Sequence, residues 1–240
     1  MHVDFETVTH KREALDKAWL KAEGFLSYTV DFIASSAVGD GFIGIMFKAV
    51  IRENESDKKL GLIVKIPPSN LTRREKCDAM EMFEREVYVY NVVLPAFKKF
   101  QEDNKIEPER GFLHFAKCYY ADFNAEKDES IVVMEDLKER DFVMCNKAVP
   151  ATFKHAKLVF AALGRFHALS FAFKAKKPEE FDTYKKLKDI FAKKFYKEHF
   201  LPSFSAVIER AANTFDESDI KSKNRVLKLK ENVEGMIKGL

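Results

Sequence analysis

The chain has 240 residues, of which 46% are hydrophobic and 13% aromatic, a composition typical of a folded protein and not of a disordered tail. Its 41 Lys and Arg residues nearly balance 38 Asp and Glu residues, and the net charge of +3 argues against a nucleic-acid-binding or membrane-surface protein. The three cysteines are widely spaced and form no CxxC pair, and no apolar run has the length of a signal peptide or membrane span. We therefore expect a cytoplasmic protein without a zinc site or a disulfide framework.

The first elements along the chain are a helix and then strands. Within residues 1–24, apolar residues recur at helical spacing from Thr9 onward and Gly24 is a natural helix end, which predicts an amphipathic N-terminal helix. Residues 28–53 are rich in β-branched and aromatic residues on both sides of a glycine-rich turn, which predicts two strands. A polar turn then leads to the apolar run 60–68, which predicts a third strand closed by two prolines.

The later elements complete the order of an α+β protein. Residues 73–100 predict a helix with one apolar stripe, which Pro95 ends or kinks, and the runs 111–123 and 130–137 predict two more strands. From Thr152 the pattern is helical almost to the end of the chain. Residues 155–174 are apolar nearly all round, so we expect that helix to be buried, with His167 serving packing rather than acid–base chemistry.

One short glycine motif points to phosphate binding. Gly39, Gly41 and Gly44 have the spacing G-x-G-x-x-G, which two unrelated architectures share. In a dinucleotide-binding fold these glycines lead directly into a helix, and a crossover helix precedes the next strand. Here they lead into strand-forming residues, and a short polar turn precedes the next strand, so that interpretation fails. The other interpretation is a turn over the phosphates of ATP, as in kinases.

The kinase interpretation requires further groups, and the sequence supplies them in the right order. Lys65 ends the apolar run LIVK, where an ammonium group can neutralise phosphate charge. The following helix offers two acids, Glu84 and Glu86, that can hold this ammonium group in place. The run VVMEDL over residues 132–137 then predicts a junction between a strand and a linker, whose backbone groups can bind adenine.

Five ordered motifs, GDGFIGIMFKAVI, LIVKIPP, MFEREVYVYNVVLPAF, IVVMEDL and LGRFHALSFAFK, together resemble the ecdysteroid kinase-like (CHK kinase-like) family, which is related to choline kinases and aminoglycoside phosphotransferases. The resemblance implies a protein-kinase-like fold, with a nucleotide-binding lobe at residues 25–137 and a helical lobe at residues 138–240. It implies phosphoryl transfer from ATP, with Mg²⁺, to a hydroxyl group of a small molecule such as an ecdysteroid or a xenobiotic. The implied nucleotide-binding residues are Gly39, Gly41, Gly44, Lys65, Glu86 in preference to Glu84, and the hinge residues Met134, Glu135 and Leu137.

One part of the family's pattern is missing from the sequence. Phosphoryl transfer requires an aspartate that accepts the substrate proton and groups that hold Mg²⁺, which in the family come from an H-G-D loop and a later aspartate. None of the six histidines begins H-G-D, and the DFN and DFV tripeptides at 122–124 and 141–143 precede the helical pattern that starts at Thr152. We therefore expect a complete nucleotide-binding lobe, an incomplete helical lobe without catalytic or metal-binding residues, and no catalysis by this chain alone.

Three hypotheses about function remain open. The chain is a partial form of a small-molecule kinase, a short pseudokinase-like module that acts by binding nucleotide, or a binder of apolar small molecules, for which only the many phenylalanines argue. If the helical lobe is incomplete, the apolar faces of residues 159–173 lack partners, and we expect an exposed apolar patch and a tendency to aggregate.

Overall fold

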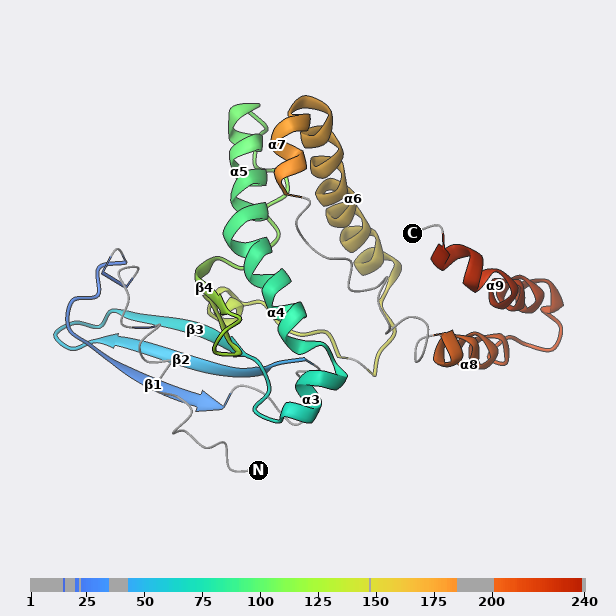
Figure 1. The fold of residues 1–240 in the computed structure, drawn as a ribbon, viewed down its shortest axis with the longest axis horizontal. Helices are drawn as coiled ribbons and strands as arrows, with labels where there is room; N and C mark the ends of the chain where they lie inside the picture. The colour runs from blue at the N-terminus through green and yellow to red at the C-terminus, as the bar shows by residue number, and fades with distance from the viewer. Residues whose placement is uncertain are drawn as a thin grey trace. The chain divides into compact units, whose positions relative to one another are not determined.

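The chain forms two compact units, Met1–Lys185 and Lys186–Leu240. A computed structural model describes residues 15, 20, 21, 23–34, 43–146, 148–184 and 201–238. The larger unit holds an antiparallel sheet and the helices α3 to α7, and the smaller unit holds α8 and α9 (Figure 1). The proposed division of the chain at a hinge near residues 132–137 stays a prediction.

The sheet has five strands in the order β1-β2-β3-β5-β4, and every neighbouring pair is antiparallel. The helices α3, α4 and α5 come between β3 and β4 in the chain. The expectation of three strands, a helical segment and two further strands is confirmed. The strands are β1 (Tyr28–Ala34), β2 (Ile45–Glu53), β3 (Lys59–Ile66), β4 (Cys118–Asn124) and β5 (Glu129–Glu135).

The main hydrophobic core lies on one face of this sheet. Phe47 on β2, Leu62 on β3 and Val133 on β5 are almost fully buried there, and Leu15 and Leu20 pack against them. The segment that contains these leucines ends at Gly24, whose φ is +77°. There Gly24 N–H donates to the Lys21 carbonyl, and Phe25 N–H donates to the Leu20 carbonyl. This is the Schellman pattern of a helix end, in which glycine is preferred, so the predicted stop at Gly24 is confirmed. Most of the predicted N-terminal helix lies outside the described residues.

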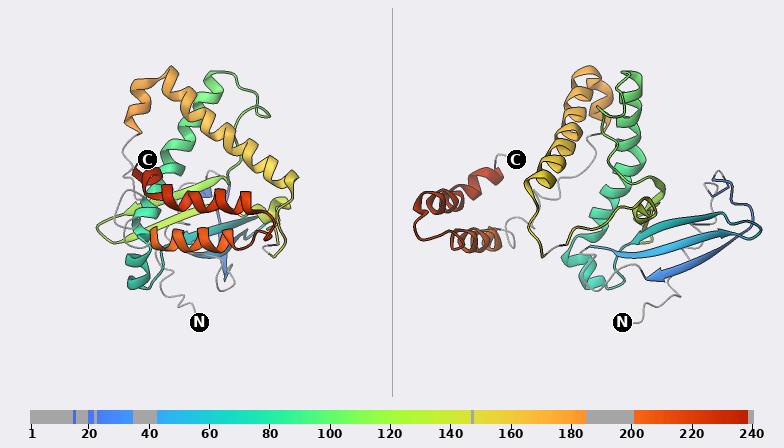
Figure 2. Two further views of the ribbon diagram at one scale, coloured as in Figure 1. Left: turned by 90° about the vertical axis from the view of Figure 1, so that its right-hand side faces the viewer. Right: turned by 180° about the vertical axis from the view of Figure 1, so that it is seen from behind.

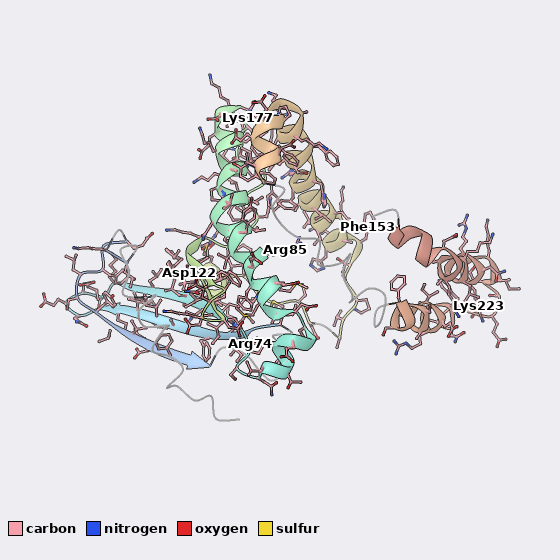
Figure 3. The ribbon with its side chains drawn as sticks, viewed as in Figure 1. Arg74, Arg85, Asp122, Phe153, Lys177 and Lys223 are labelled. Carbon is pink, nitrogen blue, oxygen red and sulfur yellow. The ribbon has the colours of Figure 1, made fainter. Side chains whose placement is uncertain are left out.

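The segment predicted as one helix over residues 73–100 is subdivided. It comprises α3 (Leu71–Lys76), α4 (Ala79–Tyr88), a π-helical turn η2 (Val89–Val93) and α5 (Leu94–Asp103). Asp78 separates α3 from α4 with a left-handed φ of 44°. Pro95 neither ends nor sharply breaks the helix, because Leu94 N–H donates to the Val89 carbonyl and the turn before the proline is widened. From α3, Arg74 donates to the Asp128 carbonyl at 2.7 Å, which ties this helix to the turn between β4 and β5 (Figure 3).

The strand predicted from residue 111 begins later, at Cys118. The backbone of Phe112, within the predicted strand, forms hydrogen bonds with the buried side chain of Gln101 on α5 and not with another strand. Phe112 N–H donates to Gln101 Oε1 at 2.6 Å, and Gln101 Nε2 donates to the Phe112 carbonyl at 3.2 Å. Because these backbone groups are already hydrogen-bonded to a side chain, the segment before β4 does not extend the sheet.

The upper part of the larger unit is a helical cluster of α5, α6 (Phe153–Lys176) and α7 (Pro178–Thr183), which Figures 1 and 2 show side by side. Thr152 caps α6, since its Oγ1 accepts a hydrogen bond from His155 N–H at 3.3 Å. Phe97 and Phe100 on α5 pack with Leu169 and Phe173 on α6. The aromatic rings of Phe100 and Phe173 lie 5.2 Å apart between centroids.

The expectation that α6 is buried is wrong. A narrow stripe containing Leu169 and Phe173 is buried, whereas His167 is exposed and so does not serve core packing. The expectation of exposed apolar side chains on this helix is confirmed. The large exposed apolar side chains on it are Phe153, which Figure 3 labels at the start of the helix, Leu158, Val159, Phe160, Leu163 and Phe171.

By length and composition α6 could also cross a membrane, contrary to the expectation that no segment could. Its most apolar window has a mean hydropathy of 1.3, and 11% of that window is buried. It is the one such helix among the described residues. A single helix of this kind is weak evidence for a membrane span, because the core helix of a folded lobe has the same length and composition.

The smaller unit is a helical hairpin of α8 (Leu201–Ala212) and α9 (Ile220–Lys238). Ile208 and Ala212 of α8 are buried, and Lys230 of α9 forms an ion pair with Glu209 of α8. The predicted helical character of this part of the chain is confirmed for residues 201–238 apart from the connecting turn.

Candidate nucleotide-binding site

The lysine and the acid singled out from the sequence meet on one face of the sheet. Lys65 near the end of β3 places its Nζ 2.7 Å from Glu86 Oε2 of α4, and both side chains are 26% exposed. The Lys65 ammonium also lies 5.4 Å from the centroid of the Phe83 ring. Glu84, the other candidate acid, is exposed and points to solvent. Because helix α4 packs against β4 and β5, it presents Glu86 and not Glu84 to the sheet.

Gly44 lies directly beside this ion pair. A Cβ atom at Gly44 would come within 3.1 Å of both the Ile66 carbonyl oxygen and Phe83 Cζ, and within 3.2 Å of Lys65 Cε. Such contacts are tighter than ordinary van der Waals packing, so glycine lets the chain before β2 approach the lysine closely. The other two glycines of the motif, Gly39 and Gly41, lie outside the described residues.

The predicted hinge lies where β5 leaves the sheet. Met134 pairs with Ile63 of β3, and its side chain is partly buried. Glu135 is the last residue of β5, and its carboxylate accepts a hydrogen bond from Lys117 N–H at 2.8 Å. Leu137 opens the short 3-10 helix η3 (Leu137–Arg140). The strand predicted to reach residue 137 thus ends two residues earlier, because the Asp136 side chain caps η3 by accepting from Lys138 N–H.

A charged cluster that sequence reasoning missed holds this junction. Lys48 of β2 lies between Asp136 and Glu139, with Nζ at 2.8 Å from Asp136 Oδ2 and 2.7 Å from Glu139 Oε1. The contacts with the Asp136 and Glu139 carboxylates raise the pKa of Lys48. Burial acts to raise the pKa of Asp136, but the Lys48 ammonium and the Lys138 N–H outweigh it and lower the pKa. A lysine in the otherwise apolar start of β2, IMFKAV, was the available signal.

Lys48 and Lys65 share a face of the sheet. Lys48 pairs directly with Ile63, and Ile63 lies two residues before Lys65 on β3. Directly paired residues and residues two apart lie on the same face. The lysine that meets the acid of α4 and the lysine that holds the linker are therefore at two places along one surface, which Met134 also borders.

The region behind Glu86 is apolar. Val87, Ala121 and Val132 are buried there, with Tyr90 and Cys118 packed against them. Burial raises the pKa of the Cys118 thiol to about 11, with a further contribution from the charge of Glu86, and burial and Glu86 likewise raise the pKa of Tyr90. Both groups are neutral at physiological pH, so neither adds a charge beside Glu86, and Lys65 is the charged group that Glu86 contacts.

The aspartates of the DFN and DFV tripeptides lie outside any cluster of metal ligands in the part of the chain that the structure describes. Among the described residues, no group of three or more His, Cys, Asp or Glu side chains is arranged to hold a metal ion. Asp122 lies on β4 (Figure 3), where its backbone carbonyl accepts a hydrogen bond from Ser130 Oγ at 2.8 Å. Asp141 follows η3 with a left-handed φ of 62°. Neither aspartate lies in a group of metal ligands.

An antiparallel sheet in the order β1-β2-β3-β5-β4, with a β3 lysine paired to a helical glutamate, is characteristic of the nucleotide-binding lobe of kinase-like proteins. A family comparison agrees with this class. The model of the ecdysteroid kinase-like family matches residues 38–239, more than four fifths of the chain, and the chain belongs to this family. Among curated proteins and among solved structures, no match was found.

Proposed function

We propose that this chain binds ATP on the sheet face that carries Lys65, with the base against the linker after β5. The observation that supports this proposal is the Lys65–Glu86 ion pair at 2.7 Å beside Gly44. A flexible lysine needs a carboxylate partner to be fixed in one position, and a fixed ammonium group can contact the phosphates of a bound nucleotide. ATP is therefore the cofactor, and backbone groups at Glu135 and Leu137 are the proposed contacts to adenine.

The family membership supports a small-molecule kinase-like phosphotransferase. We propose that the acceptor is a hydroxyl group on a small molecule, with ecdysteroids and xenobiotic alcohols as the first candidates. The six histidines supply no H-G-D motif, so the proposed activity of this chain by itself is nucleotide binding without phosphoryl transfer. A short pseudokinase-like module that acts by binding is the alternative with the same nucleotide site.

Calorimetry with ATP tests the proposed site. The change Lys65→Met removes the ammonium group, and we expect the affinity for ATP to fall about ten- to hundredfold, the worth of a charge-assisted hydrogen bond. Lys99→Met is the matched control, because Lys99 forms an exposed ion pair with Asp103 on α5 and its side chain is 70% exposed. Equal affinities for the wild-type chain and the Lys65 variant would refute the site.

A transfer assay tests whether the chain by itself binds nucleotide without transferring phosphate. The wild-type chain is incubated with γ-labelled ATP, magnesium and an ecdysteroid, and labelled steroid is measured. We expect no labelled product above a chain with the Lys65→Met change. Labelled product that depends on Lys65 would show that the chain is a competent kinase and would contradict the proposal of binding alone.

A further inference from the structure

The linker after β5 is attached to the sheet by several contacts, although most of its residues are exposed. Asp136 N–H donates to the Gly61 carbonyl at 3.1 Å, and Glu139 N–H donates to the Asp136 carbonyl at 2.9 Å. A Cβ atom at Gly61 would lie 2.9 Å from Cγ and Oε1 of Glu139, so glycine lets η3 approach β3. The linker therefore contacts the sheet through both backbone and side-chain groups.

Lys48 is the centre of these contacts. Its ammonium group binds Asp136, which is 3% exposed, and Glu139, which is 43% exposed. A nearly buried carboxylate without a cation is strongly unfavourable, so Asp136 makes Lys48 necessary at this position. The second contact, to Glu139, extends the hold on the linker by one turn of η3, past Leu137.

We propose that Lys48 is a positioning residue that fixes the linker Asp136–Arg140 so that its backbone is ready to receive the adenine base. The proposal rests on the nucleotide-binding function proposed above. The adenine base forms hydrogen bonds with backbone groups at the linker only if those groups lie at the right distance from the sheet. A displaced linker would therefore lose the hydrogen bonds to the base. Lys48, Asp136, Glu139 and Gly61 set that distance from the side of β2 and β3.

The expected effect is on the population of the competent linker. If loss of the Lys48 contacts leaves about one tenth of the molecules with the linker in place, the affinity for a ligand that uses the linker falls about tenfold. Adenosine has the base and no phosphate, so its affinity reports on the linker. ATP has both, so its affinity depends on Lys48 and Lys65. The two lysines are thereby separable with two ligands.

The test measures adenosine and ATP binding by calorimetry for the full chain and its variants. With Lys48→Met, we expect both ligands to lose affinity about tenfold. With Lys65→Met, we expect ATP to lose affinity and adenosine to keep it. Lys99→Met again serves as the control. Unchanged adenosine affinity in the Lys48 variant, with ATP still dependent on Lys65, overturns the positioning role and leaves the proposed function in place. No binding of either ligand by the wild-type chain overturns both.

Hydrogen exchange without ligand distinguishes positioning from general stabilisation. We expect the amides of residues 136–140 to exchange faster in the Lys48→Met chain, while the amides of β1 and α5 keep their protection. Faster exchange throughout the larger unit overturns the proposal, because Lys48 then acts on the whole fold. Glu139→Gln is a milder variant for use if Lys48→Met does not fold, since it leaves the buried Asp136 paired. We expect it to weaken adenosine binding about threefold, and unchanged binding and exchange overturn the proposal.

Discussion

Substitution of Gly44 by alanine tests the geometry at the proposed phosphate site. The added Cβ would meet the Ile66 carbonyl oxygen and Phe83 Cζ at 3.1 Å. Neither neighbour can easily move, because Ile66 is paired with Ile45 in the sheet and Phe83 is fully buried. Overpacking of this kind costs about 1–3 kcal/mol of unfolding free energy. For a unit of this size the melting temperature should fall by roughly 2–12 °C.

Gly164 provides the matched control for this substitution. It lies in the interior of α6, and a Cβ there meets no atom within 4 Å among the described residues. Because alanine favours a helix over glycine by about 1 kcal/mol, Gly164→Ala should raise the melting temperature by roughly 2–4 °C. Thermal unfolding followed by circular dichroism measures both variants. A Gly44→Ala chain that melts with or above the wild type would refute the reasoning about close approach.

Two further predictions concern side chains outside the ion pairs. With N-ethylmaleimide at pH 8, exposed Cys145 should be labelled while partly buried Cys118 is not, because a pKa of about 11 leaves roughly one Cys118 thiol in a thousand ionised. Comparable labelling of both cysteines, measured by peptide mass, would contradict the raised pKa of Cys118. On α6, Phe160 is 71% exposed and Phe173 is 1% exposed. Phe160→Glu should therefore reduce self-association in light scattering without loss of stability, whereas Phe173→Ala should cost about 3–5 kcal/mol, and equal effects on stability would argue against the exposed patch.

The sheet was predictable because its strands are short apolar runs bounded by turn residues. The Lys65–Glu86 pair could also be anticipated, since a lysine after LIVK and acids in the next helix leave few arrangements once the strand and helix are placed. The choice of Glu86 came from the family's pattern and not from periodicity, because Glu84 and Glu86 lie on one helix two residues apart. Helical phase against the sheet decides between them, and that phase is a property of the packed structure.

Other features depend on contacts that no local pattern contains. Asp136 ends β5 because its side chain caps η3 and meets Lys48, a residue 88 positions earlier in the chain. Gln101 hydrogen-bonds the backbone of Phe112, 11 residues later, and keeps it out of the sheet. The exposure of α6 was mispredicted because apolar residues all round a helix show only that the helix can be buried. They do not show whether other elements of the fold cover it.

The π-helical turn at Val89–Val93 determines what a deletion within the long helical segment would do. It contains about one residue more than an α-helical turn of the same rise, so it rotates the part after it by roughly 100°. Val87 before it faces the sheet, and Phe97 after it faces α6. A natural or engineered loss of one residue here would restore regular α-helix and turn the aromatic side chains of α5 away from α6. The packing of α5 against α6 thus depends on the number of residues in this turn as well as on the side chains in contact.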